Sequence, residues 1–113
     1  MRLRIFEAST QIAEAEIYAL DPPMSVAMAK FFPSEAYDQA RHANVIDGNY
    51  TGDRSAILRI EMQDGSTMKS NAISIQDWPA LDEREVHILG IYEPNFDELF
   101  HEHPDFKAYW GEA

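Results

Sequence analysis

The chain has 113 residues, of which 45% are hydrophobic and 12% aromatic, and its formal net charge is −11. Such fractions are typical of a folded globular protein, and the length predicts a single domain over residues 1–113. The excess of acids argues against direct binding to nucleic acid or to anionic membranes, because phosphate contacts need clustered lysine and arginine. The sequence has no cysteine, which excludes disulfides, thiolate metal sites and a cysteine nucleophile.

The ends and motifs of the sequence narrow the function further. Glu7 follows Met1 too closely for the apolar stretch of a signal peptide, and no run approaches the roughly twenty apolar residues of a membrane-spanning helix. We therefore expect a cytoplasmic location. The sequence contains neither a nucleophile elbow nor a glycine-rich phosphate loop, so we expect a binding role without a cofactor.

The first third of the chain alternates between apolar and polar residues. This alternation predicts strands at residues 2–8 and 24–32. Residues 10–20 are ambiguous, because their alanine and glutamate content suits a helix while their charged residues alternate with apolar ones; we favour a strand. Asp21-Pro22-Pro23 predicts a turn. Residues 33–54 form the longest irregular stretch, and a loop of that length is often functional.

A β-hairpin is predicted at residues 56–75, with its turn at Asp64-Gly65. A three-residue loop of residues 64–66 would set Met62 opposite Met68, whereas a two-residue loop would set it opposite a polar residue. Apolar side chains favour apolar partners across a strand pair. We therefore predict the three-residue loop, with the glycine in the left-handed conformation.

Residues 84–92 are apolar on both faces, which predicts a central strand. Asn95 then predicts a helix start, and Pro104 opens a second short helix that Gly111 ends. Together these elements predict an α+β domain, with a mainly antiparallel sheet of five or six strands followed by two short C-terminal helices. The sheet is expected to form a half-open barrel or a single curved sheet. No internal repeat is visible.

Most of the excess negative charge lies in residues 76–113, which carry ten acidic and two basic side chains together with both tryptophans. Charge of one sign interleaved with aromatics predicts a contact surface for a basic protein. The residues that we expect to carry this surface are Asp97, Glu98, Glu102 and Trp110.

A non-catalytic interaction module is therefore the leading hypothesis. In size, acidity and expected location the chain is similar to small inhibitor and immunity proteins, which neutralise basic toxins or nucleases. The similarity concerns bulk properties and is not carried by a motif. It implies a basic protein partner, with self-association into a homo-oligomer as a further alternative.

Two alternatives involve the histidines. A small-ligand-binding domain or an enzyme would have its pocket between the sheet and the 33–54 loop, with Tyr37, His42 and His87 as its polar groups. His101 and His103 lie among carboxylates, a combination that can ligate zinc or manganese. Their spacing matches no known helical zinc signature, and a solvated helical turn is the simpler interpretation.

Overall fold

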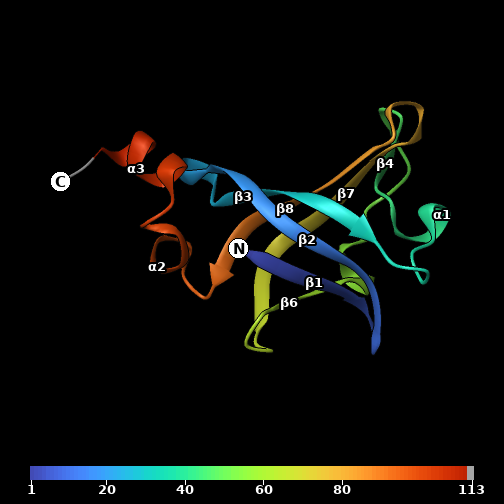
Figure 1. The fold of residues 1–113 in the computed structure, drawn as a ribbon, viewed down its shortest axis with the longest axis horizontal. Coiled ribbons are helices and arrows are strands. Elements are labelled where there is room, and N and C mark those ends of the chain that lie inside the picture. Colours follow the sequence, from blue (N-terminus) through green and yellow to red (C-terminus); the bar gives the residue numbers. More distant parts are fainter. Residues whose placement is uncertain (112–113) are drawn as a thin grey trace.

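A computed structural model describes residues 1–111 and shows a closed six-stranded β-barrel with helices at its two ends (Figure 1). The strands pair in the cyclic order β1-β2-β3-β8-β7-β6, and every pairing around the ring is antiparallel. Their bounds are β1 Arg2–Glu7, β2 Thr10–Asp21, β3 Val26–Pro33, β6 Arg59–Met62, β7 Thr67–Trp78 and β8 Glu83–Glu93.

Shorter elements cover the ends of the barrel. The segment between β3 and β6 contains α1 (Gln39–His42), β4 (Val45–Ile46), β5 (Asn49–Tyr50) and the 3₁₀ turn η2 (Ser55–Ile57). Here β4 runs parallel to β7 and extends the sheet. After β8 come α2 (Phe96–Phe100) and α3 (Pro104–Trp110), which lie at the opposite end of the long axis from α1 and β4 (Figure 1).

These observations confirm the α+β class, the mainly antiparallel sheet and the two C-terminal helices. The ambiguous segment at residues 10–20 is strand β2, as we favoured. The sheet closes into a barrel, because β1 pairs with β6 and β3 pairs with β8. The predicted half-open barrel is therefore broadly right but imprecise, and the alternative of a single curved sheet is not what the chain forms.

The hairpin between β6 and β7 has a three-residue loop, but the predicted register is wrong by one residue on each strand. Ile60 lies opposite Met68, and the Met62 N–H donates to the Ser66 carbonyl oxygen at 2.8 Å, so the loop is residues 63–65. Gly65 adopts the left-handed conformation (φ 88°) as predicted. A three-residue loop of this kind places its left-handed residue last, which fixes the glycine at the third loop position.

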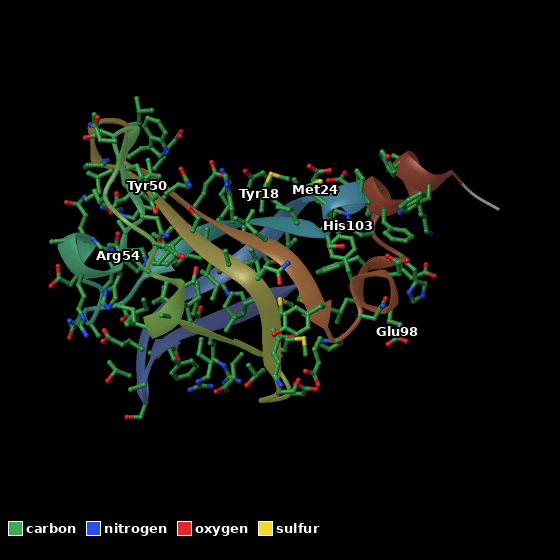
Figure 2. The ribbon with its side chains drawn as sticks, turned by 180° about the vertical axis from the view of Figure 1, so that it is seen from behind. Tyr18, Met24, Tyr50, Arg54, Glu98 and His103 are labelled. Carbon is green, nitrogen blue, oxygen red and sulfur yellow. The ribbon has the colours of Figure 1, made fainter. Side chains whose placement is uncertain are left out.

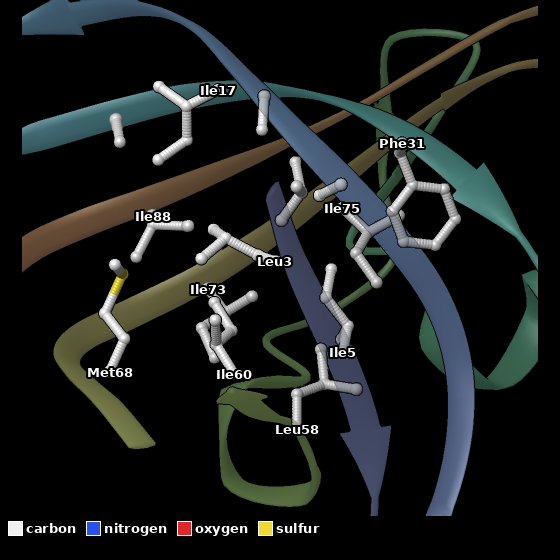
Figure 3. Packing of buried hydrophobic residues seen from close by; sticks show 14 of the residues in the cluster. Leu3, Ile5, Ile17, Phe31, Leu58, Ile60, Met68, Ile73, Ile75 and Ile88 are labelled. Carbon is white, nitrogen blue, oxygen red and sulfur yellow. The ribbon is translucent and has the colours of Figure 1, made fainter. Parts of the chain in front are cut away.

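The barrel interior holds one apolar core (Figure 3). β2 and β3 contribute four fully buried alanines together with a few larger side chains such as Ile12 and Phe31, whereas the other strands contribute mainly leucine, isoleucine and valine. A mixture of small and large residues suits the narrow interior of a six-stranded barrel. The larger fully buried side chains are Leu3, Ile5, Ile12, Ile60, Ile75, Val86 and Ile88, and each contributes about 1.5–3 kcal/mol by leaving water.

The two long hairpins of the barrel are built alike. Each has a 12-residue strand, a 3₁₀ turn that begins with proline, a left-handed residue and a return strand. The turns are η1 (Pro22–Met24) and η3 (Pro79–Leu81), and the left-handed residues are Ser25 and Asp82. We missed this structural repeat in the sequence, because aligning the first prolines brings few other identical residues together.

Candidate functional site

The two hairpins differ inside the barrel, next to their turns. In the first, Leu20 lies opposite Ala27, which is an apolar pair. At the equivalent place in the second, Asp77 lies opposite Arg84, and the Asp77 side chain is fully buried. The Arg84 Nε lies 3.3 Å from the Asp77 Oδ1. A buried ion pair costs desolvation energy that an apolar pair does not. The second hairpin thus has a charged pair where the first has an apolar pair, and this end of the barrel is polar.

Tyr37 connects this ion pair to the segment between β3 and β6. Its hydroxyl donates to the Asp77 Oδ2 at 2.6 Å. The ring meets Phe31 edge-on at 5.1 Å and stacks on His42 at 5.8 Å. Burial, and then the neighbouring Asp77 carboxylate, raise the pKa of Tyr37 far above its usual range, so the hydroxyl remains a donor.

His42 is buried, and both of its ring nitrogens have partners. The Asp38 N–H donates to Nδ1 at 2.9 Å, so Nε2 carries the proton and donates to Glu7 Oε1 at 2.7 Å. Arg41 also binds Glu7, and its hydrogen bond, followed by that of His42, lowers the pKa of Glu7 to about 2. His42 therefore holds α1 against β1 and has no free nitrogen to act as a base.

A cleft opens beside Arg84, where β3 and β8 separate. Pairing between the two strands covers only the stretch from Ala27 to Lys30 on β3. Beyond it lies a cleft of about 370 Å³, with the last residues of β3 on one side and residues 82–85 on the other. At the other end of the same seam the Ile91 N–H donates to the Ser25 carbonyl oxygen, which keeps the strands together.

A second candidate site covers α2 and α3. We call Asp97, Glu98, Glu102, Tyr109 and Trp110 the acidic–aromatic face, and all five side chains are exposed. The Trp110 side chain is 57% exposed and that of Tyr109 is 54% exposed. The Asn95 Oδ1 accepts hydrogen bonds from the N–H groups of Asp97 and Glu98, which fixes the start of α2 as predicted.

A chain of aromatic contacts positions this face on the core. Phe96 is buried against Phe100, with ring centroids 4.8 Å apart, and it also contacts Phe106 at 6.4 Å. Phe106 in turn contacts Trp110 at 6.4 Å, and Tyr109 meets Trp110 edge-on at 4.8 Å. The exposed rings are therefore held in place by buried ones.

The predicted pocket residues do not all meet. Tyr37 and His42 stack on each other, but His87 lies on the outer wall of the barrel, between Met28 and Ser74 on the neighbouring strands. Its Nε2 is 3.7 Å from the Glu85 Oε1. Strand alternation explains this separation, because Val86 and Ile88 point inward and His87 must therefore point outward.

Sequence reasoning missed Asp77 and Arg84 as members of a site. The signal was available, because Ile73, Ile75 and Asp77 follow one another at every second position on the inward face of β7. An acid that continues an inward apolar series indicates a buried charge. A charge count over residues 76–113 does not separate this buried acid from the exposed ones.

The two C-terminal histidines have local partners. The His103 Nδ1 accepts a hydrogen bond from the Asp105 N–H and so begins α3, and the His101 Nδ1 donates to the Glu98 carbonyl oxygen at 3.1 Å. Within residues 1–111 no group of three or more histidine or carboxylate side chains is placed to hold a metal ion. The geometry gives the predicted metal site no support.

Comparison with known proteins gives no relative from which a function could be carried over. No helix within the described residues is long and apolar enough to cross a membrane. No family model, no curated protein and no solved structure matches the chain.

Proposed function

We propose that the protein is a non-catalytic interaction module that binds a basic protein through the acidic–aromatic face. The observation that carries the proposal is the exposure of Trp110 and Tyr109 on α3, which directly follows α2 with its exposed acids Asp97 and Glu98. Large aromatic side chains of monomeric proteins are usually at least half-buried, and they are enriched among the residues that dominate binding energy at interfaces.

The apolar part of the face extends beyond α3. This helix packs against η1 and β2, and the Asp105 Oδ2 accepts a hydrogen bond from the Leu20 N–H at 3.0 Å. Met24, in η1, is 65% exposed and lies beside α3 (Figure 2). An exposed thioether next to a helix that carries two exposed aromatic rings suits the apolar centre of an interface.

The charges of the face favour a partner with positive charge. Within the described residues, the carboxylates of Asp97 and Glu98 have no ion-pair partner, and Glu98 projects from α2 (Figure 2). Glu102 is partly neutralised, because the Lys107 Nζ lies 3.2 Å from its Oε2. Unpaired acids on a binding surface increase the association rate with a basic protein and disfavour an acidic one.

This role resembles that of the small inhibitor and immunity proteins, which neutralise basic toxins or nucleases. Rigidity matters, because a surface that is ordered before binding loses less entropy in the complex. The aromatic chain from Phe96 to Trp110 supplies that order.

The pocket of Tyr37, His42 and His87 is less well supported as the functional site. His42 has no free nitrogen, Tyr37 donates its hydroxyl proton inward to Asp77, and His87 lies on the outer wall. None of these three residues lines the cleft between the end of β3 and residues 82–85.

Comparative capture tests the proposed interaction. The wild-type protein, the double variant Asp97→Asn/Glu98→Gln and the control double variant Glu35→Gln/Glu83→Gln are immobilised and exposed to lysate of the source organism. The control removes the same charge from exposed acids away from α2. We expect one basic protein that the wild-type and control retain and the α2 variant loses. Equal retention by all three, or capture only of a second copy of this chain, would contradict the proposal.

A further inference from the structure

The helix α3 carries both exposed rings of the acidic–aromatic face, yet it is only lightly anchored. It has seven residues, and none of its side chains is buried. It packs on η1 and β2, where the Leu20 N–H donates to the Asp105 Oδ2, and its Phe106 ring contacts Phe96. A helix this short is marginal without support, so the hydrogen bonds at its ends influence how often it opens.

The residue that begins α3 is a histidine. His103 lies between α2 and α3 (Figure 2), its backbone is extended (φ −70°, ψ 137°), and its Nδ1 accepts a hydrogen bond from the Asp105 N–H at 3.0 Å. This is the geometry of an N-cap, a position that favours asparagine, aspartate and serine. Within residues 1–111 the other two α-helices follow that preference, because Asp38 begins α1 and Asn95 begins α2. Of the three caps, only the imidazole changes its charge near neutral pH.

Proton uptake by His103 would remove its cap. An imidazole accepts a hydrogen bond only through a nitrogen without a hydrogen, and the imidazolium has N–H groups on both sides. The protonated ring would therefore place a donor against the Asp105 N–H. A cation is also unfavourable at the N-terminus of a helix, where the helix dipole is positive. The His103 side chain is only partly buried, so protons from solvent reach it.

The charged side chains around His103 do not replace the lost cap. Those on the adjoining elements are His101, Glu102, Asp105 and Lys107 in the same stretch of chain, Asp97 and Glu98 on α2, and Asp21 at the end of β2, whereas η1 has none. The Asp105 Oδ2 already accepts the Leu20 N–H, and Glu102 is paired with Lys107. The other acids are exposed, and attraction between exposed charges contributes little.

We propose that His103 is a pH switch for the acidic–aromatic face. While His103 is neutral, α3 is capped and holds Tyr109 and Trp110 in place. When His103 takes up a proton at mildly acidic pH, the cap is lost, α3 opens more often and binding of a basic protein weakens. Loss of a good N-cap typically shifts a helix equilibrium about fivefold. The regulation of binding rests on the proposed function, whereas the opening of α3 does not.

Hydrogen exchange of backbone amides measures the opening of α3 in the protein alone. The Lys107 N–H donates to the His103 carbonyl oxygen and the Gly111 N–H donates to the Lys107 carbonyl oxygen, so both amides report on this helix. We expect their protection factors, corrected for the intrinsic exchange rate, to fall about fivefold between about pH 7.5 and about pH 5.5. Constant protection of both amides over this interval would overturn the proposal.

Three variants assign the effect to the cap. His103→Asn keeps a capping acceptor that does not titrate, and we expect equal protection of α3 at the two pH values. His103→Ala has no acceptor, and its protection at neutral pH should already be as low as that of the acidified wild type. The matched control His101→Asn removes an exposed histidine that caps no helix, and it should keep the pH dependence of the wild type. A pH dependence that persists in His103→Asn, or that disappears in His101→Asn, would overturn the proposal.

Binding of the captured basic protein tests the regulation. Its affinity is measured for the wild type and for His103→Asn at the same two pH values, so that titration of the partner cancels in the comparison. We expect acidification to weaken binding of the wild type more than that of His103→Asn, by up to about fivefold. Equal weakening in the two proteins would overturn the regulation. Opening of α3 as predicted, without capture of any basic protein, would contradict the proposed function and leave the switch in α3 established.

Discussion

Asp77 occupies in the second hairpin the position that Leu20 occupies in the first, so the same fold has an apolar end and a charged end. The first hairpin therefore serves as a natural comparison for the buried ion pair of the second. Leu20 and Ala27 show that this position is compatible with an apolar pair.

Replacing the ion pair with its apolar counterpart tests how the pair acts on stability. Asp77→Leu alone leaves Arg84 without its counter-charge, and we expect it to lower the free energy of unfolding by about 3 kcal/mol. The double variant Asp77→Leu/Arg84→Ala should regain most of that loss, although the Tyr37 hydroxyl remains without its acceptor. Urea denaturation of both single variants and the double variant gives the coupling energy. Simply additive losses would show that the two side chains do not act as a pair.

The low pKa of Glu7 predicts that the folded protein loses stability as the solution becomes acidic. Its hydrogen bonds with Arg41 and His42 lower its pKa from the ordinary 4.5 to about 2 in the folded protein. Between these values the unfolded chain binds more protons at this group than the folded protein does, so the stabilisation is complete above pH 4.5 and is lost as the pH falls toward 2. Glu7→Gln should therefore lose less stability than the wild type over this interval in urea denaturation. Parallel pH profiles of the two proteins would contradict this role of Glu7.

Two glycines with positive φ should respond differently to alanine. A Cβ on Gly90 (φ 64°) would lie 2.3 Å from the Asn71 Nδ2, whereas a Cβ on Gly65 (φ 88°) would meet nothing within 4 Å. Gly65→Ala should cost only the backbone strain, about 1 kcal/mol. Gly90→Ala should cost clearly more, and adding Asn71→Ala should recover most of the difference, because of the three contacts only the one with the Cβ of residue 71, at 3.1 Å, remains. Thermal unfolding of the three variants checks the order, and equal losses at the two glycines would show that the contact with Asn71 relaxes freely.

Trp110 should matter for binding and little for stability. Its side chain is mostly exposed, so we expect Trp110→Ala to change the free energy of unfolding by less than about 0.5 kcal/mol. If the ring is a central anchor, the same variant should weaken binding of the captured partner by about 2 kcal/mol or more. Tyr50→Ala is the matched control, since Tyr50 is 72% exposed on β5, far from α3 (Figure 2). A larger binding loss in the Tyr50 variant would place the interface at the other end of the barrel.

Local patterns predicted the strands and helices well, because alternation and capping act over a few residues. Residues 10–20 form a strand since Ala13 and Ala15 point inward and Glu14 and Glu16 outward. Asn95 begins α2 as its side chain suggested. The closure of the barrel and the likeness of the two hairpins depend on pairings between distant strands, which no local pattern records.

The sites were only partly predictable for the same reason. Exposure of Asp97, Glu98, Glu102 and Trp110 agrees with their placement on short terminal helices. The rest of the acidic segment does not form one surface, since β8 belongs to the barrel wall and Asp77 is buried. The meeting of Tyr37 with the Asp77–Arg84 pair depends on how the segment after β3 folds over the barrel end, and the sequence holds no short-range signal for it.

The most direct measurement is the association rate of the captured basic partner as a function of salt. It is measured for the wild type, for Asp97→Asn/Glu98→Gln and for the control Glu35→Gln/Glu83→Gln. We predict that the α2 variant associates several-fold more slowly at low salt, with a weaker salt dependence, while the control follows the wild type. Equal rates and equal salt dependence for the α2 variant and the wild type would contradict an interaction through the acidic–aromatic face.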